Sequence, residues 1–321
     1  MKSLAELQLA ARQIRRSIVD VAFHAPVDGV HLGSALSMVD IATVLYGSVM
    51  RYQPENMAAQ ERDRFLLSKG HAALALYTTL HHYGVLSDEQ LATFDQSGSQ
   101  FPALTPMNPA LGIDFAGGSL GLGVGFASGI AWHQRLKQQP WHSYVVLGDG
   151  ECNEGSIWES ALFAAHHGLD NLTAIVDVNG YQSDIACEQT LKMNFPALWQ
   201  ACGWHVEVCD GHDIQALRQA FAAPSHNKPK AVIATTVKGK GISFMENNNA
   251  FHRAKLSAAQ HGAALEELGM KISVSPADVR AWSMMGTRGT FGVTLLNLAQ
   301  QNPNIIGLTA DLGITSGMER F

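Results

Sequence analysis

The chain has 321 residues, of which 46% are hydrophobic and 16% are charged, a composition typical of a globular protein with a large core. A formal net charge of −6, without any basic run, argues against nucleic acid or an anionic membrane surface as the main partner. The N-terminal segment 1–16 has charges at helical spacing and no apolar signal-peptide core, so we expect a cytoplasmic protein.

The four cysteines do not form the paired framework of a disulfide-rich protein. A metal-like spacing does occur in the stretch that contains Cys202, His205, Cys209 and His212. However, His205 lies in the alternating segment WHVEV, which Cys209 ends, and His212 lies in the following turn. The pattern therefore favours a strand and a turn over a zinc site.

The N-terminal part of the chain is predicted to be helical. Residues 4–23 have the spacing of an amphipathic helix, which proline and glycine at 26–29 interrupt. A second helix is expected to begin near Ser34 or Leu36. His31 lies just before this helix and is well placed to point into a cleft, although the residues alone favour a simple turn histidine.

A second histidine, His71, follows the segment RDRFLLSKG and opens the helix AALALYTTLHH. Segment 97–114 is rich in proline and glycine without helical period, which predicts a long loop. The next stretch, FAGGSLGLGVGFASGIAW, reads as a small-residue turn into a glycine-rich helix. Such a helix alone indicates only close packing against a neighbour.

The segment 144–184 has the pattern of one strand–helix–strand unit. Residues 144–147 and 173–178 are short apolar, β-branched runs typical of buried parallel strands, and 156–168 has helical period. Asp149 and Asn179 each follow a strand, so we expect them to emerge together at the carboxyl edge of the sheet, where open α/β sheets bind ligands.

The residues at this edge have chemistry suited to magnesium and phosphate. A carboxylate, an amide oxygen and a nearby main-chain carbonyl are hard ligands that leave positions for water and phosphate oxygens. Gly148 and Gly150 allow close approach of a phosphate to the backbone and to the following helix N-terminus. The simpler alternative for the GDG sequence alone is a tight turn in which Asp149 caps the helix.

Two further strands are predicted at 204–209 and 230–237, with a turn and a helix between them. Together these elements predict an α/β fold with a doubly wound, mostly parallel sheet and helices on both faces. Segment 257–280 is a polar, alanine-rich connector, and a new unit begins at Trp282.

The GDG sequence, followed by Glu154, Gly155 and the Asn179 motif, resembles the thiamine diphosphate enzymes, specifically transketolase. Three other stretches resemble the same family: SKGHAA, the GGSLGLG turn, and KGKGISFMENNNAFH with Glu246. The resemblance covers nearly the whole chain. It implies thiamine diphosphate and Mg²⁺ as cofactors, with Asp149, Asn179 and the main-chain carbonyl of Tyr181 as metal ligands.

The resemblance also implies roles for other residues. Those expected to contact the cofactor are His71, Gly118, Ser119, Leu120, Gly150, Glu154, Asn179, Lys238 and His252. Those expected to contact the sugar substrate are His31, Ser34, His252, Arg288 and Thr315, and those expected to take part in catalysis are His31, His71 and His252. Lysine and histidine donors match the negative charge of a diphosphate. For Lys238, a solvated loop position is the alternative.

The sequence departs from the family pattern at several positions. Val30 and Leu32 flank His31 where the family has a GHPG stretch, Leu122 replaces a glutamine, and Phe251 replaces a tryptophan. The family's GHP histidine is missing, because FPALTPMNP stands in its place. This last difference makes the usual donor sugar uncertain.

We therefore expect residues 1–270 to form the diphosphate-binding domain and 271–321 to form a linker and the start of a pyrimidine-binding domain. The family transfers a two-carbon ketol unit from a ketose phosphate to an aldose phosphate, and a glutamate of the pyrimidine domain activates the cofactor. That glutamate would lie beyond Phe321, so a C-terminal partner subunit or the rest of a longer chain is expected, in a homodimer or heterotetramer. The alternatives are a deoxyxylulose-phosphate synthase-like or 2-oxoacid dehydrogenase-like enzyme, and a non-catalytic thiamine diphosphate-binding subunit.

Overall fold

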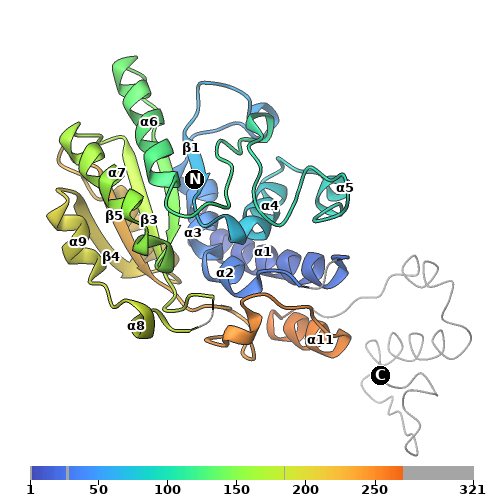
Figure 1. Ribbon diagram of the computed structural model, residues 1–321. Helices are drawn as coiled ribbons and strands as arrows, with labels where there is room; N and C mark the ends of the chain where they lie inside the picture. Colours follow the sequence, from blue (N-terminus) through green and yellow to red (C-terminus); the bar gives the residue numbers. More distant parts are fainter. Residues whose placement is uncertain (1, 27–28, 184, 270–321) are drawn as a thin grey trace, which may run out of the picture. The chain divides into compact units, whose positions relative to one another are not determined.

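A five-stranded sheet in the order β1-β2-β3-β5-β4 lies at the centre of the fold (Figure 1). The computed structural model describes residues 2–26, 29–183 and 185–269. All neighbouring strands are parallel, so their carboxyl ends share one edge. The strands are β1 (Arg64–Leu67), β2 (Ser143–Gly148), β3 (Leu172–Val178), β4 (His205–Asp210) and β5 (Lys230–Thr235).

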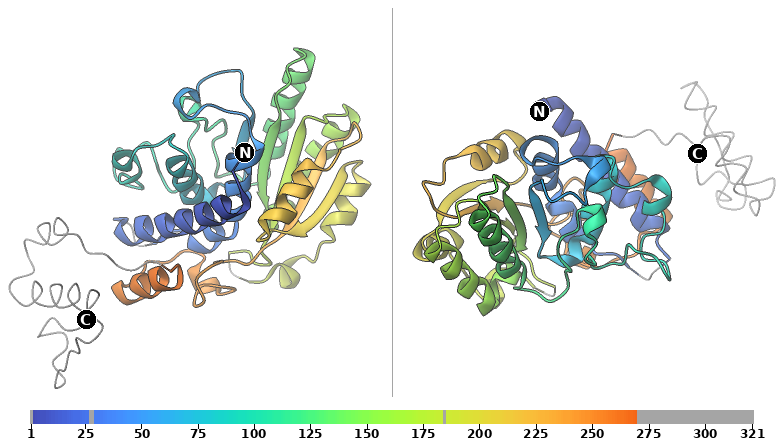
Figure 2. Two further views of the ribbon diagram at one scale, coloured as in Figure 1. Left: turned by 180° about the vertical axis from the view of Figure 1, so that it is seen from behind. Right: turned by 90° about the horizontal axis from the view of Figure 1, so that it is seen from above.

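Helices cover both faces of the sheet (Figures 1 and 2). Those before β2 are α1 (Leu4–His24), α2 (Leu32–Ser37), α3 (Val39–Val44), α4 (Ala73–His82), α5 (Asp88–Leu91) and α6 (Gly123–Leu136). Those after β2 are α7 (Gly155–His166), α8 (Cys187–Thr190), α9 (Phe195–Ala201), α10 (Ile214–Ala222) and α11 (Ala258–Glu267). A capping box formed by Ser3 and Glu6 starts α1, which satisfies backbone donors that would otherwise be unpaired.

The strands alternate their side chains between two apolar cores. Val146 and Ile175 join the core with α1 to α4 and α10, whereas Val145 and Val176 join the core with α6, α7 and α9. Both sets are fully buried, as expected for strands covered on both faces. This arrangement confirms the predicted doubly wound α/β fold.

Most of the predicted strands and helices appear close to their expected bounds. The first helix continues to His24, and the strands that flank the GDG turn are present. The elements that were not predicted include the edge strand β1, the short helices α5, α8 and α9, and α11 inside the segment read as a connector. The helix expected near Ser34 begins earlier, at Leu32. The expected unit at 271–321 lies outside the described residues.

Within the described ranges, the helices are too short or too polar for any of them to cross a membrane.

Candidate functional site

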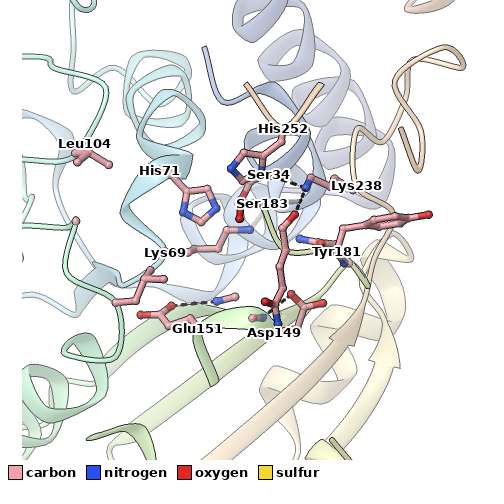
Figure 3. Close-up of a pocket in the computed structure, with 16 residues that line it drawn as sticks. Ser34, Lys69, His71, Leu104, Asp149, Glu151, Tyr181, Ser183, Lys238 and His252 are labelled. Carbon is pink, nitrogen blue, oxygen red and sulfur yellow. Dashed lines mark hydrogen bonds between the residues drawn. The ribbon is translucent and has the colours of Figure 1, made fainter. Parts of the chain in front are cut away.

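A pocket of about 270 Å³ lies at the shared carboxyl edge of the strands (Figure 3). The loops after β1, β2, β3 and β5 all contribute to it. Lys69 follows β1, Asp149 follows β2, Asn179 follows β3 and Lys238 comes shortly after β5. Because these strands are adjacent and parallel, residues far apart in the sequence meet at one place.

The turns after β2 and β3 hold Asp149 and Asn179 in defined orientations. The two carboxylate oxygens of Asp149 accept hydrogen bonds from the backbone N–H groups of Gly150 (2.8 Å) and Gly180 (2.7 Å). The Asn179 side-chain oxygen accepts one from Tyr181 N–H (3.2 Å). Burial, and then the nearby charge of Asp177, raise the pKa of Asp149. A cation beside Asp149 would relieve this electrostatic cost.

Lys238 lies across the pocket from Asp149 (Figure 3). Its ammonium donates to the main-chain oxygen of Gln182 (2.9 Å) and the side-chain oxygen of Asn249 (2.5 Å), and lies 3.1 Å from Nδ1 of His252. With Lys238 as the donor, Nδ1 of His252 is the acceptor, so Nε2 carries the proton of the neutral ring. Burial, and then the charge of Lys69, lower the pKa of Lys238 to about 8.

Three histidines from distant segments form a triangle at this site. The ring centroid of His31 lies 5.7 Å from that of His71 and 5.3 Å from that of His252, and the last two are 5.8 Å apart. Burial lowers the pKa of His31, with a further effect from Arg253, and lowers that of His71 well below its usual value, with a further effect from Lys69. His31 and His71 are therefore neutral at neutral pH and suited to hydrogen bonding and proton transfer.

A buried ion pair that the sequence patterns did not predict supports the floor of the site. Lys69 and Asp177, both fully buried, form a salt bridge, and Ser37 (2.6 Å) and Thr236 donate to the same carboxylate. Burial alone would raise the pKa of Asp177, but Lys69 and these hydrogen bonds outweigh it and lower the pKa. The signal in the sequence was a lone carboxylate inside the apolar strand LTAIVDV.

Glu151, also not predicted, connects three segments around the pocket. Its carboxylate accepts hydrogen bonds from Ser68 (2.5 Å), Gly121 N–H (2.9 Å) and Gly148 N–H (3.1 Å). Burial raises its pKa. With these three bonds, Glu151 has a positioning role at the pocket wall.

Glycines allow two pocket loops to cross in close contact. A Cβ on Gly70 would lie 2.7 Å from the backbone nitrogen of Gly118. Gly118 has φ +136°, a conformation that other residues rarely adopt. The small residues noted in the sequence therefore serve this crossing.

The pocket fits a ligand that has both a metal and an anionic group. Ser34 and Gln182 both line the pocket. The Oγ atom of Ser34 and the Nε2 atom of Gln182 are buried and have no hydrogen-bond partner among the residues that the structure describes. Buried polar atoms are normally satisfied, so these two indicate a missing ligand or water. Within the described residues no cluster of three or more His, Cys, Asp or Glu could hold a metal. A metal at Asp149 would therefore need oxygens from Asn179, the backbone, water and phosphate, which is the ligand set that Mg²⁺ accepts.

The structure brings most of the predicted site residues together. Those that line the pocket are Ser34, His71, Gly118, Leu120, Asp149, Gly150, Asn179, Tyr181, Lys238 and His252. His31 lies beside it through its ring contacts, whereas Ser119 and Glu154 are exposed and outside the pocket lining. Arg288 and Thr315 lie outside the described residues. Leu104, from the loop that lacks the family's histidine, lines the pocket with a partly exposed apolar side chain.

The two histidines with metal-like spacing have other partners in the structure. His205 contacts Glu207 (2.7 Å), and His212 contacts Asp40 and Val237, both at 2.8 Å.

Comparison with known proteins identifies relatives of this chain. Residues 7–289 match the family model "Transketolase, thiamine diphosphate binding domain". The chain is 38% identical over 243 residues to the 6-deoxy-6-sulfo-D-fructose transketolase subunit of Clostridium sp. (strain MSTE9), covering 74% of this chain and 88% of the relative. It is 37% identical over 272 residues to an apulose-4-phosphate transketolase subunit of Actinobacillus succinogenes, covering 83% of this chain and 97% of the relative.

A solved structure gives the same result. The crystal structure of transketolase from Campylobacter jejuni superposes with a TM-score of 0.78 and 28% sequence identity, covering 94% of this chain and 48% of that one. The chain thus spans about half the length of this full-length transketolase, but most of the length of the two bacterial subunits.

Proposed function

Because the chain belongs to the transketolase family and contains its thiamine diphosphate-binding domain, we propose that it is the subunit that holds the diphosphate and Mg²⁺ in a two-subunit ketol transferase. The enzyme would transfer a two-carbon unit from a ketose to an aldose. The observation that carries this proposal is the convergence of Asp149, Asn179 and Lys238 on one pocket from the carboxyl ends of three strands. Ketol transfer by the complete assembly tests it.

The residues of this chain divide the binding of the cofactor between them. Asp149, Asn179 and the main-chain carbonyl of Tyr181 would hold Mg²⁺, while Lys238 and His252 would bind the diphosphate oxygens as cationic and neutral donors. His71, Gly118 and Leu120 line the wall where the cofactor's rings would lie, with Ser119 and Glu154 near it. When bound, the cofactor supplies the carbon nucleophile that ketol transfer requires.

The histidine triangle would orient the sugar. His31 and Ser34 belong to one short segment at the site, and His252 reaches it from the opposite loop. Neutral imidazoles both donate and accept hydrogen bonds, so His31, His71 and His252 suit sugar hydroxyls and can accept a proton from one of them. Arg288 and Thr315 remain candidates for contacts to a substrate phosphate.

Replacing His31 with alanine is expected to leave thiamine diphosphate affinity within about twofold and to lower kcat/KM of the complete assembly by about 100-fold, the size typical of a lost general acid–base group. His31 contacts the other two rings but is not part of the pocket lining around Asp149 and Lys238. Calorimetry and a coupled ketol-transfer assay measure the two quantities. A large loss of cofactor affinity would show that His31 contacts the cofactor instead.

Thiamine diphosphate affinity is expected to fall as pH rises above about 8, because only the charged form of Lys238 attracts the diphosphate. The bound diphosphate raises the pKa of Lys238 in the complex. The affinity therefore has its full value below the pKa that Lys238 has in the ligand-free protein, about 8. Above it, the dissociation constant rises by up to about tenfold per pH unit. Calorimetry at saturating Mg²⁺ between about pH 7.5 and about pH 9.5 measures this profile, with Lys238→Arg as the control that stays charged. An equally steep profile in the control would exclude Lys238 as its origin.

The substrate is proposed to be a sugar that carries an anionic group. Two relatives are named for 6-deoxy-6-sulfo-D-fructose and for apulose-4-phosphate, and both names include an anionic group. Leu104 and Leu120 make part of the pocket wall apolar, so the reacting end of the sugar is held by the histidines and not by this wall.

The glutamate that activates the cofactor is proposed to come from a partner subunit. Asp149 and Glu151 are the carboxylates that line the described pocket, and both already accept hydrogen bonds from the backbone at its base. The two bacterial relatives that the chain matches over most of their length are themselves named as subunits.

A second copy of this chain is proposed to cover the exposed face of α6 and α7. Large apolar side chains are exposed there, among them Phe126 at 53% and Leu162 at 57%. Gly125 and Gly129 of α6 are also exposed. Glycine weakens a helix, so its presence on an exposed face is explained where another backbone approaches closely. Glu154 lies at the start of α7, next to this face. Pairing of two copies through this face would give a homodimer, and one partner subunit bound to each copy would give a heterotetramer.

A further inference from the structure

We propose that His212, Asp40 and Arg15 form a clamp that positions Lys238, by holding the backbone on both sides of it. This inference rests on the proposed function of Lys238 as a diphosphate ligand. The three residues lie outside the pocket lining and come from three different elements: α1, α3 and the turn between β4 and α10. They are positioning residues and not catalytic ones.

The clamp holds the Lys238 loop at its two ends. On one side, Val237 N–H donates to Nε2 of His212 at 2.8 Å. On the other side, Nε of Arg15 donates to the main-chain oxygen of Lys240 at 3.1 Å. Asp40 joins the two arms, because its carboxylate binds the Arg15 guanidinium at 3.1 and 2.5 Å and lies 2.8 Å from Nδ1 of His212.

The hydrogen bonds determine the tautomer of His212. Since Nε2 accepts from a backbone N–H, it carries no proton, and Nδ1 therefore donates to Asp40. Burial alone would raise the pKa of Asp40, but the charge of Arg15 and the hydrogen bonds from His212 and Arg15 outweigh it and hold the pKa below its usual value. Asp40 thus stays ionised and orients both arms.

Backbone bonds also hold the loop between the two arms. Gly239 N–H donates to the oxygen of Gly33, and the oxygen of Lys238 accepts from Asn247 N–H, both at 2.9 Å. Gly239 has φ +80°, and a Cβ there would lie 2.3 Å from the oxygen of Met245. The backbone path is therefore narrow, and a shift at Val237 or Lys240 would move the ammonium of Lys238.

The sequence DGHD at 210–213 is explained by this arrangement. Asp213 caps α10 by accepting from Gln215 and Ala216 N–H, and Asp210 accepts from His212 N–H at 2.8 Å. A Cβ on Gly211 would lie 2.4 Å from the Thr236 side chain, so only glycine lets the turn approach the Lys238 loop. Each residue of the turn helps to place the His212 ring.

The test uses the full chain and variants matched in chemistry. His212→Leu removes both ring contacts, whereas the side-chain oxygen of His212→Gln can still accept from Val237 N–H. His261→Leu is the control, because His261 also contacts an aspartate, Asp20, at 2.8 Å, and its side chain is 17% exposed against 12% for His212. His261 lies in α11 and Asp20 in α1, so this contact does not hold the backbone of the Lys238 loop.

Hydrogen exchange of the ligand-free protein gives a readout that does not depend on activity. We expect His212→Leu to increase the exchange rate of the Val237 amide by about tenfold or more, and His212→Gln to leave it within about threefold. Arg15→Lys keeps the charge that Asp40 requires but should remove the bond to the main-chain oxygen of Lys240. It should therefore raise the exchange rates of the amides around Lys240 and leave that of the Val237 amide unchanged. It keeps the inference testable if His212→Leu does not fold. Unchanged exchange at Val237 in His212→Leu, or at the Lys240 side in Arg15→Lys, would overturn the clamp.

Calorimetry with thiamine diphosphate and Mg²⁺ tests the link to Lys238. We expect His212→Leu to weaken binding by about fivefold to tenfold, equal to one lost hydrogen bond, and His261→Leu to leave it within about twofold. In a Lys238→Met background, His212→Leu should cause no further loss, because its effect passes through the lysine. An equal loss in both backgrounds would overturn the clamp while leaving the proposed function intact. A wild-type chain that binds no thiamine diphosphate would overturn both.

Discussion

Replacing Asp149 with alanine is expected to abolish Mg²⁺-dependent binding of thiamine diphosphate, with a loss in affinity of at least about 100-fold. Among the described residues, Asp149 supplies the carboxylate that faces the proposed metal position, and Asn179 and a main-chain carbonyl are neutral. Water can fill the vacant coordination position but cannot replace the charge. Calorimetric titration of the full chain at fixed Mg²⁺ measures the effect.

The loss of binding in Asp149→Ala supports the metal assignment only if the variant is folded. Asp149 is buried and accepts hydrogen bonds from Gly150 and Gly180, so thermal unfolding should be recorded beside the titration. Asp170→Ala is a suitable control, because Asp170 lies before β3, at the opposite edge of the sheet from Asp149, and forms a surface pair with Arg135 at 3.6 Å. A folded Asp149→Ala variant with unchanged Mg²⁺-dependent affinity would refute the metal assignment.

The purified chain is expected to sediment as a dimer and to show no ketol transfer, and addition of a C-terminal transketolase subunit is expected to raise the rate by at least about 100-fold. The apolar face of α6 and α7 gives the physical reason for dimerisation, since exposed apolar patches of this kind mark interfaces. Turnover is expected to be absent because the described pocket supplies no free carboxylate to activate the cofactor. Asp149 and Glu151, the carboxylates that line it, are both held by backbone donors. Sedimentation and a coupled ketol-transfer assay provide the measurements.

A partner variant makes this experiment specific. A C-terminal subunit whose activating glutamate is replaced by glutamine should bind the chain equally well and restore no activity. Phe126→Glu in the present chain should separate the dimer, because it introduces a charge into the exposed apolar face. Full activity of the purified chain alone would overturn the proposal of a partner and require a proton relay within it.

The sequence predicted the central part of the fold because buried parallel strands have a strong pattern. The apolar runs that become β2 and β3 are covered on both faces, and their spacing allows only one short crossover helix. The pattern is weak in β1, which has four residues and begins with Arg64, and in α11, where Ala264 and Leu265 are the buried residues. Short edge strands and mostly exposed helices derive their stability from neighbours that a local pattern does not reveal.

The sequence allowed us to predict which residues meet at the site where each of them follows a strand. It did not reveal pairs of residues that meet across the fold. Asp149 and Asn179 follow adjacent strands, so their meeting follows from the chain order. The Lys69–Asp177 pair and the contact of His212 with Asp40 join positions 108 and 172 residues apart. The sequence contains their chemistry, a carboxylate in an apolar strand and a histidine in a turn, but no local spacing indicates the partner.

The proposed function depends most on the position of the metal, which a crystal structure with thiamine diphosphate and Mn²⁺ in place of Mg²⁺ would locate by anomalous scattering. We expect an anomalous peak at the carboxyl edge of β2 and β3, about 2 Å from an oxygen of Asp149 and from the side-chain oxygen of Asn179, with the diphosphate between the metal and Lys238. A peak at another group of residues, or a cofactor bound without contact to Asp149, would contradict it.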